Sequence, residues 1–227
     1  MLVPAESPSR EELELGLYEP DVTQLITERL RAGMTFIDLG AYSGYYTLLA
    51  SKLVGSTGRV YCFDPDPRIF PILEENLRRN GCLNVIAVNK GGSDSTGAAV
   101  LAPGPLERSF LSNEPLKGGA LVETVRLDDY FRSQVWPAVD LLKMDVEGSE
   151  MEVLRGMTEL CQRNPNLGLI IESNPFAMAR SQVTFSEVVT KLEELGFSRA
   201  KVIEKQMGLV SLAQLPRSKL ICNLFVV

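Results

Sequence analysis

The chain has 227 residues and not one histidine. Histidine is the side chain most often used as a general base, and it is the commonest ligand of transition metals in proteins. A Ser-His-Asp triad, a Cys-His protease and a His-ligated zinc site are therefore excluded. Any proton that this protein moves must go to a carboxylate, a lysine, a tyrosine or a metal-bound oxygen.

Cysteine is also scarce, and none of the four cysteines forms a C-x-x-C pair. The sequence therefore lacks the usual spacing of a zinc or redox motif. Cys62 and Cys222 lie in apolar, strand-like runs, where we expect them to be core residues.

The chain lacks any apolar run near the roughly 20 residues that a membrane span needs. Its first residues, MLVPAESPSREELE, contain no apolar segment of the signal-peptide type. We therefore expect a cytoplasmic protein with reduced thiols that does not bind a membrane. The net charge is −6 and there is no basic run, whereas nucleic-acid binding normally uses a basic face. These features predict a small-molecule partner and no nucleic acid; they carry no signal for oligomeric state.

What the chain does contain is an alternation of strand and helix patterns. Strands are expected at 35–39, 59–64, 84–89, 98–101, 121–127, 139–144, 168–172, 199–204 and 220–227. Helices are expected at 21–31, 45–54 and 71–80, after Asp128 and Asp129, within 145–157 and at 184–195. This order predicts an α/β fold with a doubly wound, mostly parallel sheet. The last two strands are expected to form an antiparallel hairpin at its edge.

The chain reads as one domain over residues 21–227, preceded by an N-terminal arm. Residues 1–20 are rich in proline, serine and glutamate, which predicts a mobile or loosely packed segment. Residues 102–120 are dense in glycine and proline, which predicts an insertion that faces the substrate. Arg108, Ser109 and Phe110 are its candidates for shaping an acceptor pocket.

A glycine loop follows the first strand, in the segment Asp38-Leu-Gly-Ala-Tyr-Ser-Gly44. Gly40 and Gly44 allow a tight turn and a close approach to a ligand. A dinucleotide site needs G-x-G-x-x-G, whose middle glycine admits a pyrophosphate. Tyr42 occupies that middle position, which favours a ligand without phosphates, such as S-adenosylmethionine. Asp38 suits the ammonium group of that ligand.

Asp64 ends the second strand, about 20 residues after the loop, where an acidic side chain can accept hydrogen bonds from ribose hydroxyls. NAD-dependent enzymes use the same arrangement, so Asp64 does not by itself separate the two cofactors. An NAD-linked oxidoreductase and a non-catalytic binding module therefore stand as alternatives to a methyltransferase.

Four segments resemble the FkbM family of S-adenosylmethionine-dependent methyltransferases. They are FIDLGAYSGYYTLLAS, GRVYCFDPDPRIFPILEENLRRN, VETVRLDDY and VDLLKMDVEGSEMEVLRGM. The K-x-D-x-E-G-x-E and L-D-D-Y segments are much more specific than a glycine loop, and the resemblance covers about residues 18–160. It implies a class I methyltransferase fold, with O-methylation of a hydroxyl on a sugar or another secondary metabolite.

The resemblance also implies cofactor contacts beyond the glycine loop. Family members commonly have Glu-Pro after the second strand, whereas this chain has Asp64-Pro65, whose shorter acid should still reach a ribose. Class I methyltransferases often contact the adenine from the region after the third strand, which makes Ser93 and Asp94 candidates. An Asx turn is the alternative explanation for Asp94.

Carboxylates gather at the expected carboxyl ends of the fourth and fifth strands. We expect Asp145 to face the methyl-transfer centre, as a base or a metal ligand, and also to lie beside the cofactor. Glu147 and Glu172 are further catalytic candidates, and three carboxylates would suit magnesium. In the alternative interpretation, Glu147 and Glu150 stabilise the first turn of a helix and Lys143 is a paired residue of the rim.

Overall fold

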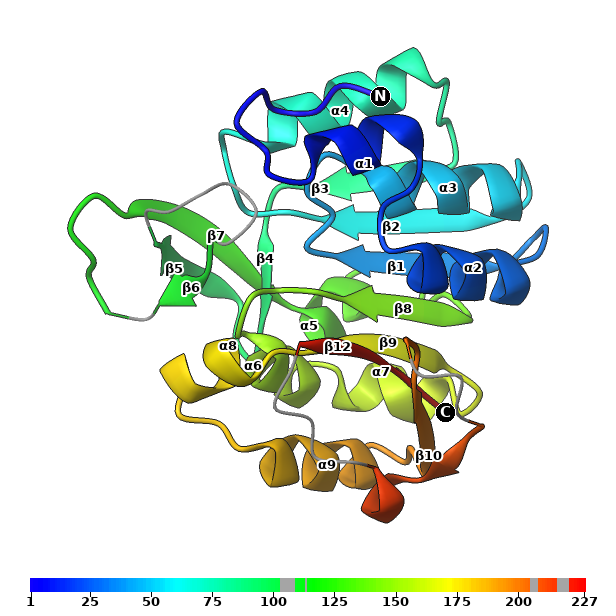
Figure 1. Cartoon of the computed structure of the whole chain (residues 1–227), viewed down its shortest axis with the longest axis vertical. Helices are drawn as coiled ribbons and strands as arrows, with labels where there is room; N and C mark the ends of the chain where they lie inside the picture. The colour runs from blue at the N-terminus through cyan, green and yellow to red at the C-terminus, as the bar shows by residue number, and fades with distance from the viewer. Residues whose placement is uncertain (103–108, 113, 205–207, 216–220) are drawn as a thin grey trace.

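The computed structural model of the chain describes residues 1–102, 109–112, 114–204, 208–215 and 221–227 (Figure 1). These residues form an eight-stranded sheet with helices on both faces and a separate four-stranded sheet. Arg108 lies outside the described residues, so its expected place at the acceptor pocket stays a prediction.

The larger sheet has a mostly parallel centre and an antiparallel end. Its strand order is β11-β10-β12-β9-β8-β1-β2-β3. The five strands of the parallel part are β1 (Thr35–Leu39), β2 (Arg59–Phe63), β3 (Val85–Val88), β8 (Leu141–Met144) and β9 (Gly168–Ser173). The remaining strands are β10 (Arg199–Val202), β11 (Val210–Ser211) and β12 (Cys222–Val226). The predicted fold class is confirmed.

The antiparallel end differs in one respect from a simple edge hairpin. β12 pairs with β10 on one side and with β9 on the other, antiparallel to both. The last strand therefore lies inside the sheet, and the two-residue β11 forms the edge. All of β12 is buried, which explains its apolar sequence: both faces of this strand are covered.

Helices cover the two faces in sets. One set is α2 (Pro20–Arg29), α3 (Tyr45–Val54) and α4 (Phe70–Arg79). The opposite set is α5 (Leu127–Arg132), α6 (Glu150–Arg155), α7 (Thr158–Arg163) and α9 (Phe185–Glu194). The described helices also include α1 (Arg10–Leu15), α8 (Pro175–Arg180) and the 3₁₀ turn η2 (Leu212–Gln214). No helix in the described part of the chain is long and apolar enough to cross a membrane.

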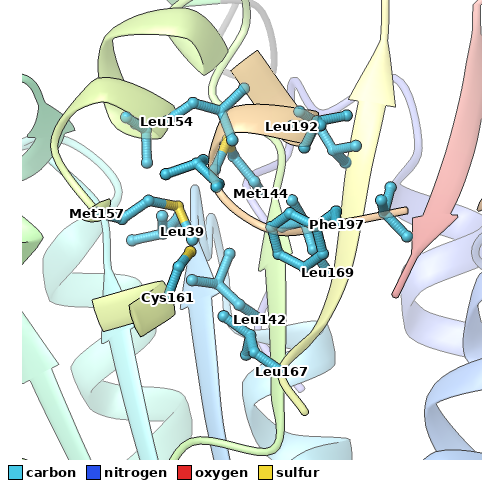
Figure 2. Packing of buried hydrophobic residues seen from close by; sticks show 14 of the residues in the cluster. Leu39, Leu142, Met144, Leu154, Met157, Cys161, Leu167, Leu169, Leu192 and Phe197 are labelled. Atoms are coloured by element: carbon cyan, nitrogen blue, oxygen red, sulfur yellow. The ribbon is translucent and has the colours of Figure 1, made fainter. Parts of the chain in front are cut away.

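The core shows why the strands carry near-continuous apolar runs. Figure 2 shows Leu39, Leu142 and Met144 of the central strands packed against Leu154 of α6 and Leu192 of α9. All five are fully buried. Because successive strand residues point to opposite faces, the neighbouring positions face the other set of helices. At the carboxyl ends of β1 and β8 those positions are Asp38 and Lys143, which pair in register.

The second sheet was not foreseen in the sequence, although two of its strands were. It consists of β4 (Gly91–Ser93), β5 (Gly97–Leu101), β6 (Leu111–Ser112) and β7 (Ala120–Arg126), in the order β4-β7-β5-β6. β6 falls within the predicted 102–120 insertion. Figure 1 shows this sheet beside the larger one. Residues 111–112 of the predicted insertion are therefore paired with β5 in this second sheet.

Residues 1–20, for which we expect a mobile or loosely packed arm, make several specific contacts in the structure. The segment contains the helix α1, whose Leu13 is buried. The backbone of Leu2 hydrogen-bonds to the side chain of Asn76 in α4 through both its N–H and its carbonyl oxygen, at 2.5 and 2.7 Å. Asn76 is fully buried, so this contact ties the start of the chain to the interior.

Candidate active site

A cavity opens at the carboxyl ends of β1, β2, β8 and β9. In an open α/β sheet this is the end where ligands bind. Its walls come from the glycine loop, both sheets and the N-terminal segment. The predicted site residues that line it are Gly40, Tyr42, Asp64, Pro65, Asp145, Glu147 and Glu172. Ser109 of the predicted acceptor-pocket segment also lines it.

The glycine loop needs its glycines. Gly40 has a φ of +77°, and a Cβ there would lie 1.8 Å from the carbonyl oxygen of Asp145. Gly44 has a φ of +94°, and a Cβ there would lie 2.7 Å from Leu73 Cδ1. Tyr42 between them also has a positive φ, 50°, which is uncommon for a bulky residue. The loop is therefore held in a conformation that exposes its backbone to the cavity.

Asp64 connects this loop to the second strand. Its Oδ2 accepts a hydrogen bond from the backbone N–H of Tyr42 at 2.8 Å, and its Oδ1 accepts one from Asp66 N–H at 2.9 Å. Burial raises the pKa of Asp64 to about 7, although these two hydrogen bonds oppose the shift. Each carboxylate oxygen retains acceptor capacity toward a ligand hydroxyl.

Asp38 lies beneath the loop. It is 1% exposed and, unlike Asp64, does not line the cavity. Its Oδ2 accepts a hydrogen bond from Thr47 Oγ1 at 2.6 Å, while Oδ1 has no partner among the described residues. Burial raises the pKa of Asp38, and the nearby Lys143 opposes that shift. The side chain of Asp38 is therefore directed toward α3.

The structure does not bring Ser93 and Asp94 to the cavity. Ser93 lies at the end of β4, and its hydroxyl donates to Asp94 at 3.4 Å. The segment just before them, Lys90 to Gly92, lines the cavity instead. The predicted region is therefore close, but the residues that line the cavity come one to four positions earlier.

Lys143 is an interior residue, not a residue of the rim. Its side chain is 3% exposed, and Nζ lies 3.0 Å from Asp145 Oδ2 and 4.9 Å from the centre of the Tyr46 ring. Burial lowers the pKa of Lys143, but the carboxylates of Asp145, Glu19 and Asp38 outweigh burial and raise it above the ordinary value. The Lys143 ammonium is therefore stabilised in its charged form by the carboxylates around it.

Glu147 and Glu150 separate into different environments. Glu150 is buried, does not line the cavity and accepts hydrogen bonds from the backbone N–H groups of Val146 and Gly148 at 3.3 and 3.2 Å. Glu150 therefore holds the loop that precedes α6 (Glu150–Arg155). Glu147 lines the cavity with a φ of +54°, and its carbonyl oxygen accepts a hydrogen bond from the guanidinium of Arg180.

Glu172 faces the same cavity from the end of β9. Burial, followed by the charges of Asp145, Glu147 and Glu150, raises its pKa to about 9. Asn174 Nδ2 donates to its Oε2 at 3.4 Å. Among the described residues, no group of three or more His, Cys, Asp or Glu side chains is arranged to hold a metal ion. The structure therefore gives no support to the magnesium site that these carboxylates suggested.

Several cavity residues were missed in the sequence. Tyr18, Tyr45 and Tyr46 line the cavity with Leu13, from the N-terminal segment and α3. The hydroxyl of Tyr46 donates to Glu19 Oε2 at 2.7 Å. The two adjacent tyrosines at 45 and 46 directly follow the glycine loop, and this position could have indicated that they lie near the cavity. The contribution of Leu13 and Tyr18 had no local signal, because it depends on how the N-terminal segment folds back onto the sheet.

Solved methyltransferases share this architecture. An S-adenosylmethionine-dependent methyltransferase from Aquifex aeolicus has a TM-score of 0.52 at 20% identity, covering 97% of this chain and 93% of that one. An S-adenosylmethionine-dependent O-methyltransferase from Thermotoga maritima has a TM-score of 0.54 at 16% identity, covering 99% and 72%. The strand order and these likenesses define a class I methyltransferase-like α/β fold.

The chain belongs to the FkbM methyltransferase family. The model of the methyltransferase FkbM domain matches residues 38–199. The chain is 31% identical over 144 residues to the hexuronic acid methyltransferase AglP of Haloferax volcanii, covering 63% of this chain and 58% of that protein. It is 32% identical over 156 residues to the methyltransferase sdnD of Sordaria araneosa, covering 54% and 60%. These matches span about three fifths of each relative.

Proposed function

We propose that this protein transfers the methyl group of S-adenosylmethionine to a hydroxyl of a small molecule, with a sugar as the favoured acceptor. The observation that carries the proposal is the cavity in which the glycine loop, locked to Asp64, faces Asp145 and Glu172. The family match and the relative that acts on a hexuronic acid support it.

The residues around the loop fit the methyl donor by their chemistry. The carboxylate of Asp64 is suited to the ribose hydroxyls, and the segment from Lys90 to Gly92, with Pro65, to the adenine. Asp38 is buried and does not line the cavity, so its contribution toward the ammonium group is limited to its charge. When bound, the cofactor supplies an electrophilic methyl group on a sulfonium.

We assign different tasks to the carboxylates across the cavity. Because the pKa of Glu172 is about 9, this group carries a proton at neutral pH and donates a hydrogen bond to the acceptor. Asp145 is held by the Lys143 ammonium and accepts the proton of the acceptor hydroxyl. Glu147 orients the acceptor from the loop beside it. Holding the acceptor oxygen in line then provides much of the rate enhancement.

Calorimetry of the intact chain with S-adenosylmethionine and S-adenosylhomocysteine tests the cofactor. We expect both to bind, and we expect Asp64→Ala to weaken binding by at least about tenfold, because a buried hydrogen-bonding group is lost. Asp94→Ala is the matched control, since Asp94 does not line the cavity, and it should bind as the wild type does. Binding of NAD in place of both ligands would instead establish the oxidoreductase alternative.

Transfer itself needs a separate measurement. Incubation with methyl-labelled S-adenosylmethionine and a panel of sugars, followed by mass spectrometry, should yield a product that is heavier by one methyl group. Cofactor binding without transfer to any acceptor of the panel would favour the non-catalytic module.

A further inference from the structure

We infer that Leu13 and Tyr18 of the N-terminal segment (residues 1–19) belong to the cofactor site and enclose the ligand that binds on the glycine loop. The inference rests on the proposed function and extends its site beyond the FkbM domain, whose match begins at residue 38. Three observations carry it. The two side chains line the cavity, the segment is attached beside the glycine loop, and two left-handed residues interrupt its backbone before α2.

Leu13 and Tyr18 supply apolar surface to the cavity wall. Leu13 is the buried residue of α1 and lines the cavity. It belongs to none of the three hydrophobic core clusters that the described residues form, so its apolar surface serves the cavity and not the core. Tyr18 is half-buried and also lines the cavity. Its ring packs against those of Tyr45 and Tyr46, at 5.8 and 6.1 Å between centroids.

The N-terminal segment is attached beside the glycine loop at two places. Figure 1 shows the segment in dark blue, passing from α4 to α2. Near its start, the backbone of Leu2 hydrogen-bonds to Asn76, whose Nδ2 also donates to the carbonyl oxygen of Ser43 at 2.8 Å. Near its end, the hydroxyl of Tyr45 donates to the carbonyl oxygen of Gly16 at 3.1 Å. Ser43 and Tyr45 lie on either side of one glycine of the loop, so a ligand that orders this loop also orders the segment.

The backbone between α1 and α2 has two left-handed residues about which the segment can turn. Gly16 has a φ of +72° and Glu19 a φ of +39°. This region is uncommon for glutamate, and such a conformation persists only where its surroundings hold it. Glu19 accepts hydrogen bonds from the Tyr46 hydroxyl at 2.7 Å and from Asn223 of β12 at 3.2 Å. The end of the segment is therefore fixed, and the residues before it can detach as a ligand enters.

The ligand and the attached segment should stabilise each other. A ligand that contacts Leu13 and Tyr18 binds the attached state of the segment more tightly than the detached state. By thermodynamic linkage, the same ligand must then shift the segment toward the attached state. Because the ligand leaves through the side that the segment covers, its dissociation is slowed for as long as the segment stays attached.

Hydrogen exchange of the intact chain, read by mass spectrometry, tests this coupling without any turnover. The probe is S-adenosylhomocysteine at saturation, about 100 times its Kd, and exchange in residues 2–18 should slow about tenfold or more. Residues 132–135, which are exposed at the end of α5 on the opposite face, should keep their rate. Protection of the glycine loop with unchanged exchange in residues 2–18 overturns the inference.

Variants of the segment test the wall itself. Tyr18→Ala removes a ring from the wall and should raise the dissociation rate of S-adenosylhomocysteine about fivefold or more. Tyr18→Phe keeps the ring and should dissociate as the wild type does. Leu17→Ala is the matched control, because Leu17 adjoins Tyr18, is 63% exposed and does not line the cavity. Surface plasmon resonance gives the rates, and equal rates for Tyr18→Ala and Leu17→Ala overturn the inference.

Binding of S-adenosylhomocysteine to the wild type distinguishes the possible failures. If that ligand does not bind, the proposed function fails and the inference fails with it. If it binds, unchanged exchange in residues 2–18 or equal dissociation rates overturn the inference alone. If Tyr18→Ala does not fold, the hydrogen-exchange result on the wild type decides.

Discussion

Gly40 lies directly against the backbone of Asp145: a Cβ on Gly40 would stand 1.8 Å from the carbonyl oxygen of Asp145. The two residues belong to neighbouring segments, because the backbone N–H of Asp145 also donates to the carbonyl oxygen of Leu39 at 3.1 Å. The contact joins the glycine loop to the carboxylate that we assign as the base. A side chain added at Gly40 must therefore displace the backbone at Asp145.

Gly40→Ala is expected to disrupt both stability and ligand binding. The alanine would have to adopt a φ of +77° and displace a backbone carbonyl, so we expect a loss of about 3 kcal/mol or more in unfolding free energy. Urea denaturation and calorimetry with S-adenosylhomocysteine measure the two effects. Gly97→Ala is the control, because a Cβ there meets nothing within 4 Å. Equal stability of the two variants would contradict the close contact.

Lys143→Met should lower the free energy of unfolding, because it removes the positive charge beside two carboxylates. Asp38 and Asp145 would then lack their opposite charge in a buried environment, for which we expect about 3 kcal/mol of destabilisation near pH 7.5. The loss should shrink as the pH falls toward 5, because burial raises the pKa of Asp38 and its carboxylate then becomes protonated. Denaturation curves at both pH values, compared with Lys52→Met on the exposed face of α3, provide the measurement. If the loss of stability is the same at both pH values, it comes from altered packing and not from the unpaired carboxylates.

Glu172 is expected to make the protein less stable as the pH rises. Its pKa is about 9 in the folded protein, against 4.5 ordinarily, so the folded state binds this proton more tightly than the unfolded state does. The contribution of Glu172 to stability is therefore greatest below about pH 4.5 and declines as the pH rises toward 9. Glu172→Gln should gain at least about 1 kcal/mol over the wild type at pH 9 and less at pH 6.

Chemical denaturation at the two pH values measures that difference. Glu193→Gln, on the exposed side of α9, removes the same charge and serves as its control. If both variants change stability equally at pH 9, the effect belongs to net charge and not to the cavity.

Asn76→Ala should release the N-terminal segment. Asn76 is fully buried and holds Leu2 twice, and its Nδ2 also donates to the carbonyl oxygen of Ser43 in the glycine loop at 2.8 Å. Losing these bonds should cost about 2 kcal/mol and leave buried backbone groups without partners. Limited proteolysis should then cleave faster within residues 1–20 than in the exposed control Asn166→Ala. An unchanged cleavage pattern would show that other contacts retain the segment.

Local patterns were sufficient for the central elements. β1 and α3 occupy 35–39 and 45–54 as predicted, because glycines at 40, 44 and 55 mark their limits. The helix expected over 71–80 begins one residue earlier, at Phe70. The strand expected from 139 begins only at Leu141, where pairing with β1 starts. Where a strand begins and ends depends on its pairing with a neighbouring strand, and the sequence of one segment does not show that pairing.

The predicted site residues divide according to their surroundings. Asp64, Pro65, Asp145 and Glu172 end strands of a parallel sheet, so their meeting at one edge followed from the fold. Asp38 ends β1 in the same way, but its side chain points under α3 to Thr47. Side chains alternate between the two faces along a strand, but this alternation does not show which face holds the ligand.

The sequence by itself determined the fold class, the glycine loop and the acid at the end of the second strand, because periodicity and turn residues act over short distances. The tertiary structure alone decided that the final strand inserts beside β9, that a second sheet forms, and that Tyr18 reaches the cavity. The hydrogen bond between Glu19 and Asn223 joins residues 204 positions apart. Such contacts arise from the packing of whole elements, and no local pattern encodes them.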